Sequence, residues 1–114
     1  MEIYKVFRTS EWDNLVSEGS TLGAPVDLAD GFIHFSTAGQ LRETLRKHFS
    51  GAGDLVLAAI EADRLGPALR WEASRGGALF PHLYRALARD EVVWTAALHE
   101  TAQGHALPEG RQWP

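Results

Sequence analysis

Residues 55–60 form an uninterrupted apolar run, LVLAAI, and this run most constrains the fold. Six residues are too few for an amphipathic helix, and the run lacks the alternation of a half-buried strand. Glycines precede it, and Gly66-Pro67 follows shortly after it. A continuous apolar run bounded in this way is typical of a strand that is buried on both faces. The chain must therefore pack protein on both sides of this strand.

Further β-prone runs lie on either side of this strand. Residues 3–7, 31–36, 68–72, 79–84 and 91–98 are rich in apolar and β-branched residues and are separated by turn-forming residues. Residues 76–77, a Gly-Gly pair, predict a turn, and residues 61–65 predict a short turn or 3₁₀ segment. Residues 20–30 contain glycine, proline and aspartate without a sustained period, so we predict a loop there.

Two helices are predicted, both in the first half of the chain. The first follows Ser10, an N-cap with Asp13 as a capping-box partner, and ends at Gly19, a C-cap. The second follows Thr37, with Gln40 at the capping-box position. The apolar residues at helical spacing are Trp12, Leu15 and Val16 in the first helix, and Leu41, Leu45 and Phe49 in the second.

Early helices and late strands indicate an α+β fold, with two N-terminal helices on a mixed or antiparallel sheet. We predict one domain over residues 1–100 and a tail over residues 101–114 that is irregular or frayed. Trp12 and Trp94 are predicted to be core residues and Trp113 to belong to the tail.

Composition excludes several classes of protein. The chain has no cysteine, which rules out disulfides and thiolate metal sites and fits a reducing cytoplasm. The net charge of −4 argues against a DNA-binding surface. No segment approaches the length of a membrane span, and the N-terminus lacks the pattern of a signal peptide. We therefore expect a cytoplasmic globular protein with no membrane partner.

The segment DGFIHFST, residues 30–37, is the first candidate for chemistry. Alternation on a strand places His34 and Ser36 on one face, and Asp30 lies just upstream. Imidazole can bind a ribose hydroxyl or a phosphate at neutral pH. The alternative is a sheet histidine whose ring is hydrogen-bonded to the backbone.

A second segment, FPHLY at residues 80–84, places His82 and Tyr84 on one strand face together with Phe80. Pro81 cannot donate to a sheet ladder, so we predict an edge strand or a strand that begins near this residue. An edge strand beside a cleft could bring His82 and Tyr84 to a ligand. The alternative is that Phe80 and Tyr84 are core aromatics.

Glu72 follows Trp71 in a largely apolar context, so burial could raise its pKa and suit it to acid–base work. It could equally form a surface ion pair with Arg70 or Arg75. The turn at residues 74–77 offers Arg75 and backbone N–H groups to a phosphate, although a plain hairpin turn is the commoner explanation of Gly-Gly.

Several signatures are missing. The sequence contains no GxGxxG after a strand, no P-loop, no HExxH and no GxSxG. The histidines do not form a close ligand pair, so we predict no metal site.

The order of these motifs, with GFIHFS at residues 31–36 and FPHLY at residues 80–84, resembles a bacterial family known as domain of unknown function 952. The resemblance extends from Tyr4 to about Leu98. It implies an ADP-ribosyltransferase-like fold, with a split β-sheet around an NAD-binding cleft. The strand FIHF also looks like the corresponding strand of NAD-dependent RNA 2′-phosphotransferases, although Tyr4-Lys5 stands where that group has His-Gly.

By this resemblance, His34 would hold a ribose or phosphate, and Tyr84 or Phe80 would stack on a flat ring. Glu72 would stabilise a ribosyl cation. We therefore expect Glu72 and His34 as catalytic residues, and Asp30, Ser36, Arg75, His82 and Tyr84 as substrate-binding residues. The expected ligand is a nucleotide, with NAD as a candidate substrate and no resident cofactor. The alternatives are a non-catalytic binding or interaction module, and acid–base hydrolysis by His34 and His82.

Overall fold

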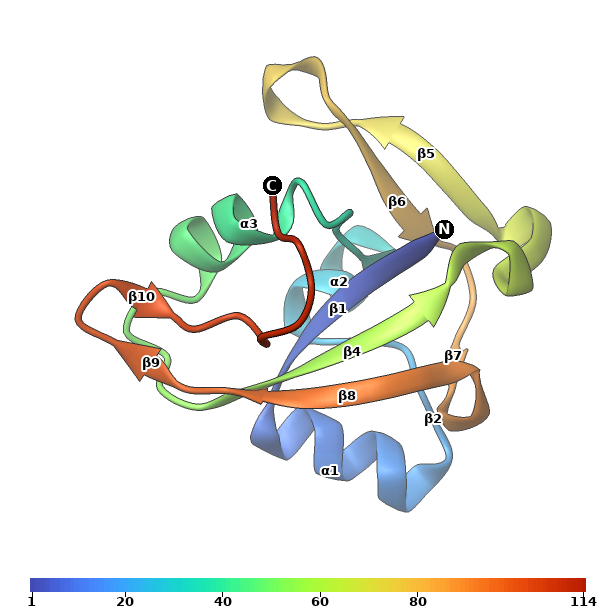
Figure 1. Cartoon of the computed structure of the whole chain (residues 1–114). Helices are drawn as coiled ribbons and strands as arrows, with labels where there is room; N and C mark the ends of the chain where they lie inside the picture. Colours follow the sequence, from blue (N-terminus) through green and yellow to red (C-terminus); the bar gives the residue numbers. More distant parts are fainter.

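The computed structural model describes the backbone of residues 1–114 and every side chain except that of Arg75. A three-stranded antiparallel sheet lies at its centre, in the order β1 (Glu2–Arg8), β4 (Leu55–Glu61) and β8 (Val92–Leu98). The LVLAAI run forms β4, the middle strand, with β1 and β8 on either side of it (Figure 1). The prediction of a strand buried on both faces is confirmed.

A second three-stranded antiparallel sheet has the order β3 (Ile33–His34), β6 (Leu79–Leu83) and β5 (Leu69–Ala73). An isolated antiparallel bridge between Tyr4 and Ser36 joins it to β1, with both N–H···O distances 2.8 Å. The two sheets therefore meet along the edge of β1. The β5–β6 hairpin projects away from the rest of the molecule (Figure 1).

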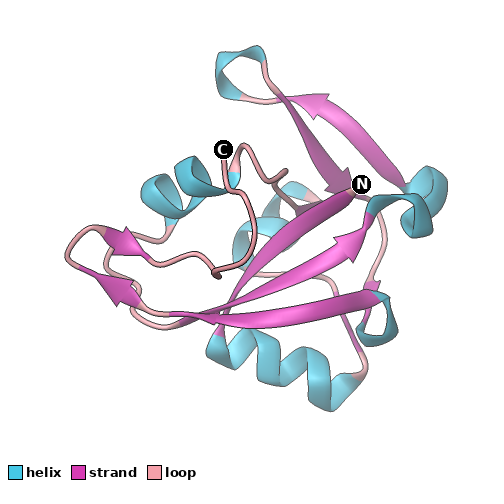
Figure 2. Ribbon diagram, in the orientation of Figure 1, coloured by secondary structure: helices cyan, strands magenta, loops and turns pink.

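Short elements complete the fold (Figure 2). Every strand pairing among the described residues is antiparallel, so the α+β class is confirmed and a mixed sheet is not found. The remaining strands are β2 (Ser20–Thr21) paired with β7 (Leu87–Ala88), and β9 (Glu100–Thr101) paired with β10 (Gly104–His105). The helices are α1 (Thr9–Glu18), α2 (Pro25–Asp30) and α3 (Leu41–His48), with 3₁₀ segments η1 (Ala62–Ala68), η2 (Arg75–Gly77) and η3 (Arg89–Glu91).

Both faces of the central sheet are covered. Alternation along β1 sends Ile3 and Phe7 into one core cluster, which includes Leu15 of α1 and apolar residues of β3 and β6. Tyr4 and Val6 enter the other cluster, with apolar residues of α3. Lys5 lies between Ile3 and Phe7 in the sequence, so it shares their face although it is charged.

The helix boundaries differ from the predicted ones. Helix α1 begins at Thr9 rather than after Ser10, and Glu11 accepts the Arg8 amide (2.8 Å) in place of the predicted Asp13 contact. The Gly19 C-cap is confirmed. Helix α3 begins at Leu41 and not directly after Thr37, because residues 38–40 form a turn.

The predicted loop over residues 20–30 is wrong in part, because it contains β2 and α2. Helix α2 has only six residues, too few to show a helical period. Its end signals were present, however. Pro25 occupies the first turn, and Gly31 ends the helix in the left-handed conformation (φ 85°).

Of the two alternatives for FPHLY, the edge strand is wrong, since β6 lies between β3 and β5. A strand that begins near Pro81 is found, since β6 starts at Leu79. The Pro81 carbonyl accepts the Phe35 amide (3.0 Å). In an antiparallel ladder Pro81 would return an N–H to the same residue, but proline has none. The missing donor coincides with the end of β3 at His34.

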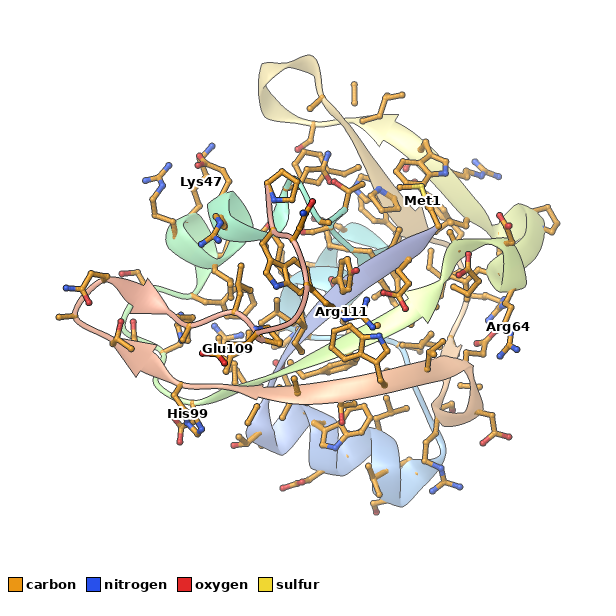
Figure 3. The ribbon with its side chains drawn as sticks, viewed as in Figure 1. Met1, Lys47, Arg64, His99, Glu109 and Arg111 are labelled. Atoms are coloured by element: carbon orange, nitrogen blue, oxygen red, sulfur yellow. The ribbon has the colours of Figure 1, made fainter. Side chains whose placement is uncertain are left out.

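The C-terminal tail is irregular over residues 106–114, as predicted, but it is packed rather than frayed. It contributes β10, and Trp113 packs edge-on against Tyr4 with ring centroids 5.1 Å apart. Arg111, seen in front of the central sheet in Figure 3, forms an ion pair with Glu2 (2.9 Å) and lies over the ring of Trp94. The tail thus covers the α3 side of the sheet. No helix among the described residues has the length and apolar character needed to cross a membrane.

Candidate functional site

Two histidines lie side by side on adjacent strands of the second sheet, β3-β6-β5. His34 of β3 lies opposite His82 of β6 in the antiparallel register. The neighbouring pair, Phe35 and Pro81, carries the inter-strand hydrogen bond, so the histidines form a pair of the non-hydrogen-bonded kind, whose side chains approach most closely. Their ring centroids are 5.3 Å apart. The register therefore puts both imidazoles on one face of the sheet.

Aromatic rings surround the two imidazoles. Phe32 stacks on His82 with a centroid distance of 4.2 Å and lies 4.6 Å from His34. It is also 5.2 Å from Tyr84, whose ring is exposed and lies under the guanidinium of Arg70 (4.8 Å). We call Phe32, His34, Glu72, His82 and Tyr84 the two-histidine site.

Glu72 of β5 connects two members of this site. Its Oε1 accepts hydrogen bonds from Tyr84 Oη (2.7 Å) and from His82 Nδ1 (2.8 Å). The bond from Tyr84, followed by that from His82, lowers the pKa of Glu72. The expectation that burial raises this pKa is therefore wrong. Glu72 pairs with His82 and is suited to act as a carboxylate rather than as a proton donor.

A second carboxylate network holds His34. Asp27 Oδ1 lies 2.6 Å from His34 Nδ1 and accepts the His34 amide (3.1 Å). Asp27 Oδ2 accepts the Lys5 ammonium (2.8 Å) and the Ala24 amide (2.7 Å). On the other side of the ring, His34 Nε2 lies 2.9 Å from Oδ2 of Asp30, the last residue of α2. One half-buried imidazole therefore touches two carboxylates.

Asp27 is ionised in this environment. Burial alone would raise its pKa, but the hydrogen bond with His34 and the Lys5 charge outweigh burial and lower the pKa to about 2. Both side chains of the Lys5–Asp27 ion pair are buried, with 6% and 0% of their surface exposed. The pair joins the middle of β1 to α2.

A glycine makes room for this carboxylate. Gly23 has a φ of 102°, and a Cβ built on it would lie 2.2 Å from Asp27 Oδ2. Any other residue would thus meet both backbone strain and a collision with a buried charged group.

Sequence reasoning missed Lys5, Asp27 and Phe32. An aspartate two residues after the Pro25 that opens a helix is a typical partner for the helix N-terminus, and it was the available signal for Asp27. A lysine in the middle of an apolar strand was the signal for Lys5. Nothing local in the sequence links either residue to His34.

The predicted site residues are only partly brought together. The structure unites His34 with Asp30, and His82 with Glu72 and Tyr84. Ser36 is buried, and its hydroxyl shares a hydrogen bond with Thr44 of α3 (2.7 Å), so it serves the packing of that helix. The side chain of Arg75 lies outside the described part of the structure.

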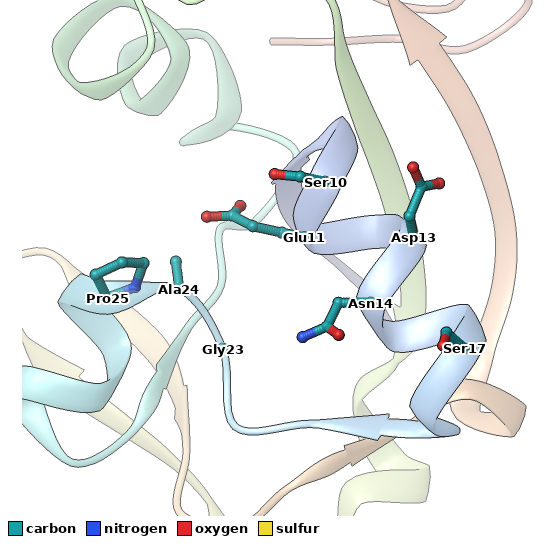
Figure 4. Close-up of a pocket in the computed structure, with 8 residues that line it drawn as sticks. All are labelled: Ser10, Glu11, Asp13, Asn14, Ser17, Gly23, Ala24 and Pro25. Atoms are coloured by element: carbon teal, nitrogen blue, oxygen red, sulfur yellow. The ribbon is translucent and has the colours of Figure 1, made fainter.

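Two surface grooves lie elsewhere. A polar groove of about 600 Å³ runs between α1 and the start of α2 (Figure 4). A smaller one, about 420 Å³, lies beside the N-terminus and η1. No residue of the two-histidine site lines either groove. Tyr84 is exposed and His34 is partly exposed, whereas His82 is buried and stacks against Phe32. The larger groove is lined by Ser10, Glu11, Asp13, Asn14, Ser17, Gly23, Ala24 and Pro25.

The carboxylates and imidazoles do not form a metal centre. Among the described side chains, no group of three or more histidine, aspartate or glutamate residues is arranged to hold a metal ion. The Nδ1 atoms of His34 and His82 contact carboxylates, which orients each ring. Such a pair is suited to hydrogen bonding and proton transfer.

Comparisons with known proteins agree with this architecture. The crystal structure of protein CC0527 from Caulobacter crescentus is 51% identical in sequence, with a TM-score of 0.89 and 92% of each chain covered. The solution NMR structure of CC0527 is 52% identical, with a TM-score of 0.81 and 91% of this chain and 90% of that chain covered. No protein with a curated description matches the sequence. Residues 6–95 match the family described as protein of unknown function DUF952, and the chain therefore belongs to the DUF952 family.

Proposed function

We propose that this protein has an ADP-ribosyltransferase-like fold and binds NAD, ADP-ribose or a related nucleotide at the two-histidine site. The observation that carries the proposal is the placement of His34 and His82 on one sheet face, 5.3 Å apart, beside the exposed ring of Tyr84. The split sheet, whose two parts meet at the bridge between Tyr4 and Ser36, also supports the fold assignment.

The ligand would meet complementary groups on this face. Imidazole Nε2 atoms can exchange hydrogen bonds with ribose hydroxyls or phosphate oxygens. Tyr84 offers a flat ring to a base, and Arg70 above that ring offers a positive charge to a phosphate. Asp30, at the edge of the site, can accept a hydrogen bond from a ribose hydroxyl in place of His34.

If the ligand is NAD, the groups present suit cleavage of the bond between nicotinamide and ribose. The bonding electron pair leaves with nicotinamide, and the cation that develops at the ribose C1′ is stabilised by a nearby carboxylate. Glu72 is ionised and contacts His82 and Tyr84 of the site, so it would accept a hydrogen bond from the ribose 2′-hydroxyl. Water attacks C1′, and its proton passes to a histidine and then to solvent, giving ADP-ribose and nicotinamide.

Binding is tested by NMR titration of ¹⁵N-labelled protein with NAD, ADP-ribose and a 2′-phosphorylated nucleotide. We expect shifts for His34, His82 and Tyr84, and loss of the shifts in His82→Ala. His99→Ala is the matched control, because His99 contacts Asp54 at an exposed position near β9 (Figure 3). An unchanged spectrum at millimolar nucleotide would rule out the proposed ligand class.

Turnover separates an enzyme from a binding module. Incubation with NAD followed by mass spectrometry should show nicotinamide and ADP-ribose, with loss of product in Glu72→Gln and retention in Glu109→Gln of the exposed tail. Binding without any product would favour the non-catalytic module. That outcome would remove the catalytic role of Glu72 while leaving the binding proposal in place.

A second candidate is acid–base hydrolysis by the histidine pair. The shared face and the anchored Nδ1 atoms of His34 and His82 favour it, and the Nε2 atom of the partly exposed His34 contacts an exposed carboxylate, Asp30 (2.9 Å), which a substrate can displace. It predicts a bell-shaped pH profile for hydrolysis of a phosphate ester, lost in either His→Ala variant. A rate that depends on one histidine alone would contradict it.

A further inference from the structure

We infer that Asp27 is the positioning residue of the two-histidine site, and that it fixes His34 with a proton on Nδ1 so that Nε2 is the atom offered to the ligand. This inference rests on the proposed function for its ligand, but the proton placement can be measured without any ligand.

The donor count at Asp27 fixes the proton position. A carboxylate accepts hydrogen bonds and donates none, so a bond between Asp27 Oδ1 and His34 Nδ1 requires the hydrogen on Nδ1. The same oxygen also accepts a hydrogen bond from the His34 backbone amide, so Asp27 holds both the backbone and the ring of His34. The ring therefore cannot adopt the form with hydrogen on Nε2 alone without losing its 2.6 Å contact.

Lys5 keeps this acceptor charged. Asp27 is buried, and a buried carboxylate without a partner would tend to take up a proton and become a donor. The Lys5 ammonium at 2.8 Å, itself buried on the inner face of β1, prevents this. Lys5 touches neither histidine in the hydrogen-bond network, so it acts on His34 through Asp27.

The charged and titratable groups around His34 come from three elements. Asp27 and Asp30 belong to α2, His82 belongs to β6, and Lys5 reaches Asp27 from β1. His34 Nε2 lies 2.9 Å from the carboxylate of Asp30, which is exposed, so a ligand can take the place of Asp30 at Nε2. The carboxylate at Nδ1, Asp27, is buried and cannot be displaced in this way.

The two histidines differ in this respect. His82 also uses Nδ1, but its partner Glu72 is 36% exposed, whereas the partner of His34 is fully enclosed. Water can compete for Glu72 and not for Asp27. We therefore expect the Nδ1 contact of His34 to be better protected from water than that of His82, although the His34 side chain itself is more exposed (34% against 8%).

The direct test is ring-¹⁵N NMR of the intact wild-type protein across the range in which histidines titrate, about pH 5 to 8. His34 should show a protonated Nδ1 throughout, and its Nδ1–H proton should exchange slowly with water. A neutral His34 with hydrogen on Nε2 would overturn the inference. Because the wild-type protein is used, no variant has to fold for this result.

A paired variant tests the role in binding. Asp27→Leu combined with Lys5→Met removes acceptor and counter-ion together, so no unpaired buried charge is left. His34 should then populate both neutral forms, and affinity for ADP-ribose should fall about tenfold, by analogy with metal-binding histidines that lose the carboxylate that orients them. Glu72→Gln is the matched control, which should change the ring signals of His82 and leave those of His34 unchanged. Unchanged His34 signals in the paired variant would contradict the inference.

The two proposals can fail separately. If His34 has the predicted proton placement but no nucleotide binds, the positioning role stands and the proposed ligand is wrong. If ADP-ribose binds and the paired variant binds it equally well, the ligand stands and Asp27 is only a structural residue.

Discussion

At the scale of single residues, the organisation of the site depends on one buried carboxylate. Asp27 accepts hydrogen bonds from Lys5, Ala24 and His34, which lie apart in the sequence but next to one another in the structure. Sequence reasoning identified the histidine and missed its partner. The reason is physical: the role of a buried carboxylate depends on which hydrogen-bond donors surround it, and here donors come from other parts of the chain.

Gly23 offers a test at this scale. Gly23→Ala should destabilise the protein by about 1–3 kcal/mol, because the new methyl group meets Asp27 Oδ2 and the residue has a positive φ. The free energy of unfolding can be measured by urea denaturation. Gly19→Ala is the control, since it has a similar φ of 83° but an open environment. Equal losses in the two variants would show that the Asp27 contact is unimportant.

At the scale of elements, strand pairing brings the site together. The pairing of β3 with β6 sets His34 against His82, and the pairing of β6 with β5 sets Glu72 against Phe80, one residue before Pro81. A register shift of one residue would turn a histidine to the opposite face of the sheet. The wrong prediction of an edge strand came from reading Pro81 by its usual place in sheets, whereas here it lies where β3 ends.

Pro81→Ala tests this account of β3. The restored N–H should face the Phe35 carbonyl and extend the ladder by one hydrogen bond, since Phe35 already donates to residue 81. One such hydrogen bond stabilises the fold by about 1 kcal/mol. Replacing proline raises the conformational entropy of the unfolded chain, which destabilises the fold by a similar amount, so the free energy of unfolding should change little. Hydrogen exchange should show a protected amide at position 81. An amide that exchanges as fast as in an unstructured peptide would contradict the proposed pairing.

At the scale of the whole molecule, the Lys5–Asp27–His34 network connects β1, α2 and β3, and therefore ties the two sheets and a helix together. The packed tail closes the other face of the central sheet through Trp113 and Tyr4. The two faces are held differently, one by a buried charged network within an apolar cluster and the other by apolar and aromatic packing.

The network predicts a loss of stability in acid. The pKa of Asp27 falls from 3.8 to about 2 on folding. A lowered pKa stabilises the fold above the unfolded value, and this contribution, about 2 kcal/mol, is lost as pH falls from about 4 to about 2. Urea denaturation at several pH values should show this slope, and the Asp27→Leu, Lys5→Met variant should show a smaller one. Equal slopes would mean that other carboxylates account for the acid sensitivity.

The sequence by itself determined the elements whose signals are local. Periodicity and capping depend on neighbouring residues and can be seen in the sequence. They predicted strand β4, the Gly19 cap, the buried Leu41 and Leu45 of α3, and the α+β class. The family also follows from the sequence, because its motifs are contiguous strings.

Only the tertiary structure decided which side chains meet. Strand register and sheet packing join distant segments. His34 contacts Asp27 and His82, Ser36 shares a hydrogen bond with Thr44, and Trp113 packs on Tyr4. No local pattern encodes these contacts, because each depends on the free energy of burying several segments at once. The same is true of the ionisation of Glu72, whose pKa is set by donors from a neighbouring strand and not by the tryptophan beside it in sequence.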